Sequence, residues 1–392
     1  MARKLQLVLM VFMVLSIVVI FNEYFIYYIA LWSCSFPSIV DPSDENIVKA
    51  IVLADPHLLG ERRGAWIDRL RREWQMERTF QTAMSLLEPD VVFIVGDVMD
   101  EGFEASEEDF KFAFERYSRI FRRPGDTPLL LVAGNHDIGF HYSVTESNVQ
   151  RFEEAFKTSS VKVVSIRNIP FVLLNSVGLT SDGCWLCSAM DAKLKESALA
   201  LRRCSPDVPS EACIQQPVPG IRPILLQHYP LYRSSDLLCH GDDLAPNIGN
   251  QQEFRESWEV ISKEATETVL SYFQPRLAFS GHTHHGCNIM HHLGTPFPTE
   301  EQTIASFSWR NRNDPNFILL TASTKDYSLD KCSPPSESLV LASYLLTILA
   351  TVAFLAWPQC SRRWYGSRRV GDAWAQPQWS DYNFHWKNRK GT

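Results

Sequence analysis

Residues 91–100 read VVFIVGDVMD, in which five apolar residues are followed by a glycine and two carboxylates. A short run that is apolar at every position and rich in β-branched side chains predicts a strand buried on both faces, as in a parallel sheet. Gly96 follows the run and lets the backbone turn tightly. The stretch therefore predicts an α/β fold in which Asp97 and Asp100 stand at the carboxyl end of a strand.

Four other predicted strands are followed by side chains of the same kind. They cover residues 47–54, 129–133, 224–226 and 276–279. The carboxyl ends of strands in an open α/β sheet meet at one crevice, so we expect the side chains that follow the five strands to converge. Together the five turns supply Asp55, His57, Asp97, Asp100, Asn135, His136, Asp137, His228, His282 and His284. A single residue of this kind is usually structural, which is how we interpret His285, His291 and His292.

The remaining elements complete one domain of alternating strands and helices. Further strands are predicted at 161–166, 171–174, 304–307 and 317–320. Helices are predicted at 74–87, 103–121, 189–201 and 254–273. Residues 184–223 contain five prolines and are predicted to form a loop-rich insertion.

The side chains at the strand ends offer imidazole, carboxylate and amide ligands and no thiolate. This set suits Mn, Fe or Zn better than Cu(I) or an iron–sulfur cluster. Two divalent cations about 3.5–4 Å apart can hold the attacking and leaving oxygens of an in-line phosphoryl displacement. We therefore predict a dinuclear metal centre that hydrolyses phosphate esters.

The ordered strand-end motifs resemble those of the calcineurin-like metallophosphoesterase superfamily, and the resemblance covers about residues 47–325. It implies a four-layer αββα sandwich with two adjacent metal ions, for which Mn²⁺ is expected and Fe or Zn are alternatives. The implied ligands are Asp55, His57 and His284 for the first metal, Asn135, His228 and His282 for the second, and Asp97 as the bridge. His136 is implied to act as a general acid over the phosphate, oriented by Asp100.

Two apolar segments bracket the predicted domain. The first runs from Leu5 to Phe21 and resumes from Tyr24 to Trp32, which is longer than the apolar region of a cleaved signal peptide. An uncleaved anchor is therefore favoured over a cleaved signal. The second, residues 339–357, would form a helix of about 28 Å, close to the thickness of the hydrocarbon core. The arginines that follow it favour a membrane span over a buried core helix.

Charge is distributed unevenly along the chain. The net charge is −7, but residues 1–33 carry +1, residues 358–392 carry +5 and the middle carries −13. An acidic middle excludes nucleic acid as the main partner, and basic flanks on both spans favour cytosolic ends. The predicted organisation is a cytosolic N-terminus at 1–4, transmembrane helix 1 at 5–32, a luminal metallophosphoesterase domain at 33–337, transmembrane helix 2 at 338–358 and a cytosolic basic tail at 359–392.

Cysteines support a luminal, oxidising location for the middle of the chain. Seven lie there: Cys184, Cys187, Cys204, Cys213, Cys239, Cys287 and Cys332. The first four could instead form a zinc knot, but their later spacing departs from that of a zinc ribbon, so disulfides are favoured. Because seven is odd, at least one thiol is free or paired with Cys34.

A narrower resemblance, to membrane phosphodiesterases that remodel glycosylphosphatidylinositol (GPI) anchors, rests on the two-span layout and on residues 54–60 (ADPHLLG) and 306–312 (SFSWRNR). It implies removal of a side-branch ethanolamine phosphate from the second mannose, with GPI-anchored proteins as substrates and the lipid bilayer as a partner. It also implies a role in ER-to-Golgi transport, and residence at endoplasmic reticulum exit sites, in the ER–Golgi intermediate compartment and in the cis-Golgi.

Arg389 and Lys390 resemble a retrieval signal through which coat or cargo receptors would read the tail, and a stop-transfer flank is the alternative. Asp242 and Asp243 could bind the ethanolamine ammonium or form a solvated turn. Arg233, and likewise Arg310 and Arg312, could contact phosphate oxygens or form structural salt bridges. Two other functions stay open: a luminal metallophosphoesterase for another phosphodiester or phosphomonoester, and an inactive cargo receptor for GPI-anchored proteins.

Overall fold

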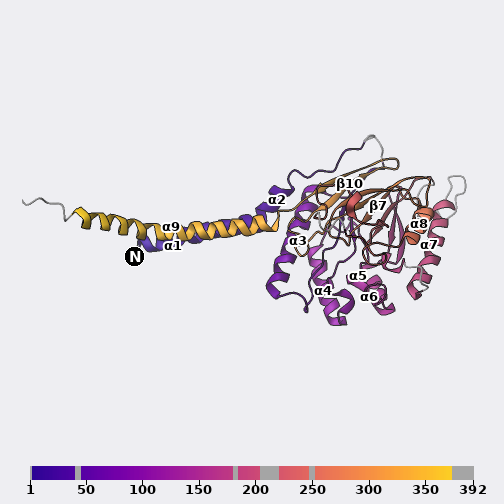
Figure 1. Ribbon diagram of the computed structural model, residues 1–392, viewed down its shortest axis with the longest axis horizontal. Coiled ribbons are helices and arrows are strands. Elements are labelled where there is room, and N and C mark those ends of the chain that lie inside the picture. Colours follow the sequence, from indigo (N-terminus) through magenta and orange to yellow (C-terminus); the bar gives the residue numbers. More distant parts are fainter. Residues whose placement is uncertain (1, 40–45, 180–183, 204–219, 247–251, 373–392) are drawn as a thin grey trace, which may run out of the picture. The chain divides into compact units, whose positions relative to one another are not determined.

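The computed structural model describes residues 2–39, 46–179, 184–203, 220–246 and 252–372 (Figure 1). The chain divides into two compact units. One unit comprises Ile20–Val340, and the other comprises Met1–Val19 together with Leu341–Thr392. Every strand found in the described residues belongs to the first unit, and the predicted metal ligands lie within it.

The first sheet has five strands in the order β11-β10-β1-β2-β3. Its members are β1 (Val48–Leu53), β2 (Val91–Val95), β3 (Leu129–Val132), β10 (Phe317–Ala322) and β11 (Tyr327–Cys332). Strands β1, β2 and β3 are parallel, whereas β10 pairs antiparallel with both β1 and β11. The parallel strands therefore bring the turns that follow β1, β2 and β3 to the same edge.

The second sheet has six strands in the order β4-β5-β6-β7-β9-β8. They are β4 (Val161–Ile166), β5 (Ile169–Leu174), β6 (Ile224–Gln227), β7 (Leu277–Ser280), β8 (Cys287–His291) and β9 (Thr299–Thr303). Strands β5, β6, β7 and β9 are parallel, and β4 and β8 pair antiparallel at the two edges. The turns after β6 and β7 therefore also lie at one edge.

Successive side chains of β1 belong to two different apolar cores, and this alternation shows how the two sheets are packed. Ala50 and Val52 belong to the apolar core that also contains Phe171 of β5, whereas Ile51 belongs to the core that contains Phe80 of a flanking helix. Successive side chains of a strand point to opposite faces, so β1 contacts the other sheet on one side and helices on the other. The fold is thus an α/β sandwich with two sheets, as the sequence predicted.

Helices flank the two sheets (Figure 1). They are α3 (Trp66–Leu87), α4 (Glu107–Ile120), α5 (Asn135–Ile138), α6 (Glu146–Phe156), α7 (Trp185–Arg203) and α8 (Lys263–Phe273). Polar side chains cap three of them: the hydroxyls of Ser106, Thr145 and Ser262 accept from backbone N–H groups in the first turn of α4, α6 and α8. Such caps satisfy donors that a helix start leaves free.

Two predicted elements differ from the structure. Residues 304–307 are buried but form no strand, because their N–H groups donate to three separate segments: Ile304 to Ser280, Ser306 to His284 and Phe307 to Ala54. The predicted helix 254–273 forms only from Lys263, since Ser257 has a φ of 64° and the chain turns there. Strands β8, β9 and β11 and helix α6 were not predicted.

The apolar segments at the two chain ends are helical. The first consists of α1 (Ala2–Ile20), a π-helical turn (Phe21–Phe25) and α2 (Ile26–Leu31), and the second is α9 (Glu337–Asp372). Stretches Lys4–Leu31 and Glu337–Trp357 are long and apolar enough to cross a membrane. The end of the first stretch packs on the domain, because Tyr27 and Leu31 are fully buried. Helix α9 continues past the predicted end of the second span.

Three disulfides occur in the described residues: Cys34–Cys332, Cys184–Cys187 and Cys239–Cys287. Cys34 is thus paired, one of the two possibilities that the odd cysteine count left open. Cys204 and Cys213 lie outside the described residues. The Cys34–Cys332 bond ties the end of the first apolar segment to β11, just before α9 begins.

Candidate metal centre

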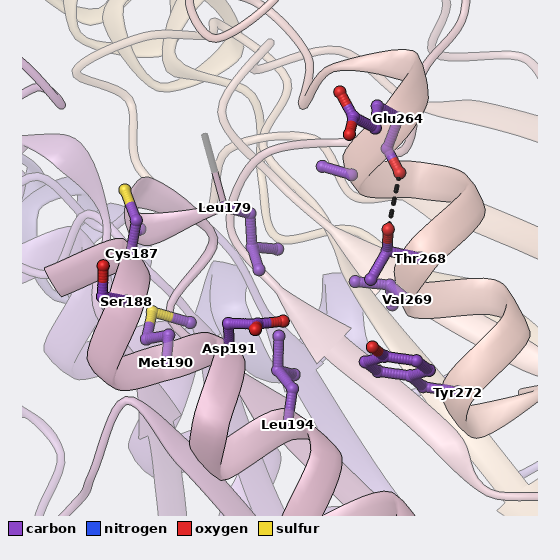
Figure 2. Close-up of a pocket in the computed structure, with 12 residues that line it drawn as sticks. Leu179, Cys187, Ser188, Met190, Asp191, Leu194, Glu264, Thr268, Val269 and Tyr272 are labelled. Atoms are coloured by element: carbon purple, nitrogen blue, oxygen red, sulfur yellow. Dashed lines mark hydrogen bonds between the residues drawn. The ribbon is translucent and has the colours of Figure 1, made fainter. Parts of the chain in front are cut away.

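A cavity of about 350 Å³ lies between α7 and α8, with Asp191, Glu264 and Tyr272 in its lining (Figure 2). Within the described ranges, its lining includes none of the side chains predicted at the strand ends. This cavity is therefore separate from the side chains at the strand ends, which form the candidate site.

The structure brings all seven predicted metal ligands together. Ligand atoms of Asp55, His57, Asp97 and His284 lie within 4.8 Å of one another, and so do those of Asp97, His228 and His282. Asn135 joins the second group, since its Oδ1 lies 3.1 Å from Nε2 of His228. Asp97 belongs to both groups, which is the position that a bridging carboxylate requires.

Hydrogen bonds fix which nitrogen of each imidazole faces the centre. Nδ1 of His228 lies 2.9 Å from the carbonyl of Val95, and Nε2 of His282 lies 2.6 Å from the carbonyl of Trp258. A carbonyl only accepts, so these nitrogens donate and the opposite nitrogens keep their lone pairs. Those two lone-pair nitrogens lie 3.3 Å apart. Lone pairs that converge in this way are suited to a shared cation.

The electrostatics of the site also favour bound cations. Burial raises the pKa of Asp55 to about 8. Burial lowers the pKa of His282 to about 3 and that of His284 to about 2. For Asp97, burial alone would raise the pKa, but His228 and His136 outweigh it and hold the pKa well below its usual range. Burial would lower the pKa of His228 as well, but Asp97 and Asp55 outweigh it and raise that pKa to about 9. Neutral imidazoles are the form that binds metals, so His282 and His284 are ready to bind, whereas a bound cation would displace the proton of His228 and balance the buried carboxylates in its place.

The backbone of the site is strained at the ligands. Asp55, His57, Asp97, His282 and His284 all have φ between 47° and 70°. Side chains other than glycine rarely adopt this left-handed conformation, which costs about 1–3 kcal/mol when the surroundings impose it. The backbone of the turns after β1, β2 and β7 thus adopts an unfavourable conformation that directs their side chains toward the metal centre.

Two glycines make room for the ligands. A Cβ on Gly134 would lie 2.1 Å from Oδ1 of Asp97, and one on Gly96 would lie 2.4 Å from Nδ1 of His228. Gly96 also has a φ of 91°. Both positions therefore require glycine for close approach, and Gly96 requires it for the turn as well.

His136 and Asp100 lie beside the predicted ligands, in an arrangement that differs from the prediction. The Asp100 carboxylate contacts Nδ1 of His57 at 3.0 Å and lies 3.9 Å from Nδ1 of His136. Nδ1 of His136 instead lies 2.8 Å from the backbone carbonyl of Asp100. The carboxylate thus orients a metal ligand, and the main chain orients His136. The guanidinium of Arg310 lies 3.7 Å from the other oxygen of Asp100, so a cation borders the centre.

The predicted substrate contacts are engaged in structural interactions. Arg233 is buried and bonds Asp236 at 2.8 Å and Thr303 at 3.2 Å. Asp242 and Asp243 both pair with Lys331, and Asp243 is buried. Arg312 bonds Asp314 and Nδ1 of His285. His291 bonds the buried Glu301 at 2.9 Å, in line with its structural interpretation.

The structure gives supporting roles to two residues for which the sequence predicted none, although Asp137 was among the side chains expected to converge. Asp137 accepts hydrogen bonds from the N–H groups of Val98, Met99 and Gly134, and so fixes the turns that carry two ligands. Its place in the Gly-Asn-His-Asp motif was the available signal. Trp258 acts through its carbonyl, which any residue has, so no side-chain pattern could have indicated it.

Comparison with known proteins agrees with this geometry. A profile described as Calcineurin-like phosphoesterase matches residues 48–286. A Mus musculus protein named Metallophosphoesterase 1 is 45% identical over 350 residues, covering 86% of this chain and 87% of that protein. A Macaca fascicularis protein of the same name is 46% identical over 351 residues, covering 87% of each.

Among solved structures, purple acid phosphatase PPD1 from yellow lupin is 13% identical with a TM-score of 0.41, covering 77% of this chain and 56% of that one. A similarity this distant supports no conclusion. The family profile matches more than half of the chain, and relatives of 45–46% identity cover most of its length. The chain therefore belongs to the calcineurin-like phosphoesterase family, whose members hydrolyse phosphoric esters with bound metals.

Proposed function

We propose that the chain is a Mn²⁺-dependent phosphodiesterase that removes a side-branch ethanolamine phosphate from the second mannose of GPI anchors. The observation that carries the proposal is the complete donor set, in which two ligand groups share Asp97. An inactive cargo receptor would be expected to lack part of this set. The choice of substrate within the family follows from the narrower resemblance at residues 54–60 and 306–312.

The two segments of that resemblance contact each other at the centre. The hydroxyl of Ser306 donates to the carbonyl of Asp55 at 2.8 Å, and the N–H of Phe307 donates to the carbonyl of Ala54 at 2.9 Å. Arg310 of the second segment borders Asp100. The segment 306–312 therefore supports the ligand turn after β1 and places Arg310 beside the centre.

The two candidate membrane spans near the ends of the chain are compatible with a membrane-anchored substrate. Two candidate spans bracket the domain, and three disulfides favour an oxidising lumen. We propose that the domain faces the lumen of the early secretory pathway and acts on GPI-anchored proteins there. Coat or cargo receptors would read the tail, whose Arg389 and Lys390 lie outside the described residues.

The roles of the chain's own residues follow from the geometry. Bound divalent metals would polarise the phosphoryl oxygens and provide a nucleophile at neutral pH. Asp97 belongs to both ligand groups, so it would keep the two metal positions at a fixed separation. Nδ1 of His136 donates to the backbone carbonyl of Asp100, so the imidazolium form of His136 would pass its Nε2 proton to the departing sugar oxygen. Arg310 would balance the charge of the phosphate.

The proposal is tested by mass spectrometry of GPI glycans from cells that lack the chain. We expect the second mannose to retain ethanolamine phosphate, and re-expressed wild type to remove it. Asp97→Ala should fail to do so, whereas Asp330→Ala, which changes an exposed carboxylate of β11, should succeed. Identical glycans in cells with and without the chain would refute the substrate. Metal analysis of the purified chain should find two Mn²⁺.

A further inference from the structure

An exposed cluster of three aromatic residues, Phe140, Tyr142 and Trp258, lies next to the metal centre. The ring centroids of Phe140 and Tyr142 are 5.8 Å apart, and the ring planes are nearly parallel. The ring centroid of Trp258 lies 5.6 Å from that of Phe140 and 5.4 Å from that of Tyr142. Tyr142 is 69% exposed and Trp258 is 40% exposed. Exposed aromatic rings in contact with one another usually mark a binding surface.

The aromatic cluster is continuous with residues of the centre. The ring of Phe140 lies 6.4 Å from that of His136. The carbonyl of Trp258 accepts a hydrogen bond from the predicted ligand His282 at 2.6 Å. A ring stacked on the cluster would thus stand beside a phosphate held at the metals, so the cluster is placed to bind the group that the phosphate is attached to.

Both turns that carry the cluster are fixed. The carbonyl of Phe140 accepts from the N–H groups of Ser143 at 2.7 Å and Val144 at 2.8 Å. The N–H of Ser257 donates to the carbonyl of the fully buried Val260 at 2.7 Å. Turns that are already held in place lose little backbone freedom when a ligand binds, which strengthens binding.

A buried hydroxyl lies at the same place. Tyr229 is 2% exposed, its ring lies 4.3 Å from that of His282, and its hydroxyl has no hydrogen-bond partner among the described residues. A buried hydroxyl without a partner is costly, and a ligand hydroxyl would satisfy it.

The charges at the cluster disfavour a cationic ligand. The guanidinium of Arg255 lies 4.6 Å from the centroid of the Trp258 ring. The carboxylate of Glu259 is engaged by Arg255, whose Nη2 lies 2.7 Å from Oε1. An ammonium group would meet a cation and an already paired carboxylate. A neutral ring suits the surface better, because its polarised C–H groups are attracted to aromatic faces and its hydroxyls can reach the ion pair and Tyr229.

We propose that the cluster of Phe140, Tyr142 and Trp258, with the hydroxyl of Tyr229, is a sugar subsite that holds the pyranose ring bearing the scissile phosphate. The inference deepens the proposed function and rests on it for the identity of the sugar as mannose. Trp258 lies within 5.6 Å of both other rings and has the largest aromatic surface of the three, so it would contribute most of the stacking.

The test compares two substrates on the purified full chain in detergent micelles. One is the ethanolamine phosphodiester of methyl α-D-mannoside, and the other is ethyl ethanolamine phosphate, which lacks the sugar. We expect Trp258→Ala to raise KM for the mannoside roughly 10- to 100-fold, as for loss of a central aromatic anchor. The KM of Trp258→Ala for the ethyl diester should rise much less than its KM for the mannoside, and its metal content should stay near that of the wild type, because the substitution keeps the carbonyl that bonds His282. Trp258→Phe should restore most of the affinity.

Trp66→Ala is the matched control, since Trp66 is 70% exposed and lies outside the cluster. Loss of kcat on both substrates in Trp258→Ala would overturn the proposal and make Trp258 a positioning residue for His282. An unchanged KM of Trp258→Ala for the mannoside would also overturn the proposal. If the same variant bound phosphatidylcholine vesicles more weakly, the cluster would instead be a membrane contact. A Trp258-dependent KM for adenosine 5′-(ethyl phosphate) but not for the mannoside would reassign the cluster to a nucleobase.

Sugar binding can be read without turnover. Saturation-transfer NMR of methyl α-D-mannoside should show contact with the wild type and not with Trp258→Ala, and equal signals would overturn the subsite. If the wild type binds the mannoside but does not cleave its ethanolamine phosphodiester, the proposed GPI reaction fails while the sugar subsite stands. The two proposals are therefore separable.

Discussion

Gly134→Ala tests whether the shared carboxylate lies where the structure places it. A Cβ at Gly134 would lie 2.1 Å from Oδ1 and 2.4 Å from the backbone N of Asp97. Ordinary contacts begin at 3.4 Å, so the carboxylate would have to move by about 1.3 Å. Gly134 has a φ of −106°, which alanine adopts without strain. The effect of the substitution is thus steric and is directed at Asp97, whose backbone would have to shift together with its carboxylate.

We expect Gly134→Ala to lower turnover by roughly 100-fold or more, because a misplacement of about 1 Å in a catalytic group costs this much. Metal content should fall below two per chain, since Asp97 serves both ligand groups. Hydrolysis of bis(p-nitrophenyl) phosphate and metal analysis of the purified chain measure the two effects. Gly125→Ala is the control, because nothing lies within 4 Å of a Cβ there. Two bound metals together with more than about a third of wild-type turnover would refute the reasoning.

Three further predictions follow from the site and the tail. Asp97→Ala should abolish hydrolysis while the circular dichroism spectrum is kept, and retention of more than about a tenth of turnover would show that the centre is not dinuclear. His136→Ala should keep both metals but lower the rate by roughly 10²–10⁴, with a smaller loss for p-nitrophenolate esters, and an equal loss for all leaving groups would exclude the acid role. Replacing Arg389 and Lys390 with Ser should move the protein toward the later Golgi or plasma membrane on immunofluorescence, with unchanged turnover.

The ligand positions could be predicted because each depends on a local pattern. Strand β2 runs from Val91 to Val95, as its apolar residues predicted, and the glycine turn after it delivers Asp97. The same holds at the ends of β1, β3, β6 and β7. Parallel pairing then brings these turns to one edge without further information from the sequence.

Other features depend on contacts that a local pattern does not contain. Strand β9 reads TEEQT and looks exposed, but Glu301 is fully buried because His291, Ser280 and Arg233 bond its carboxylate. The Cys34–Cys332 bond joins residues 298 positions apart. The aromatic cluster draws on two turns that are more than a hundred residues apart, so its rings carry no shared motif.

Asp100 shows why a motif can identify a residue and still mislead about its role. Its carboxylate holds Nδ1 of His57, and its carbonyl holds Nδ1 of His136. Burial would raise the pKa of Asp100, but the bond to His57 and the nearby Arg310 lower it, so the carboxylate stays ionised and orients a metal ligand. The orientation of His136 instead depends on the main chain, which no side-chain pattern records. One residue thus couples the positions of a metal ligand and of the proposed acid, so a shift of this turn would disturb both together.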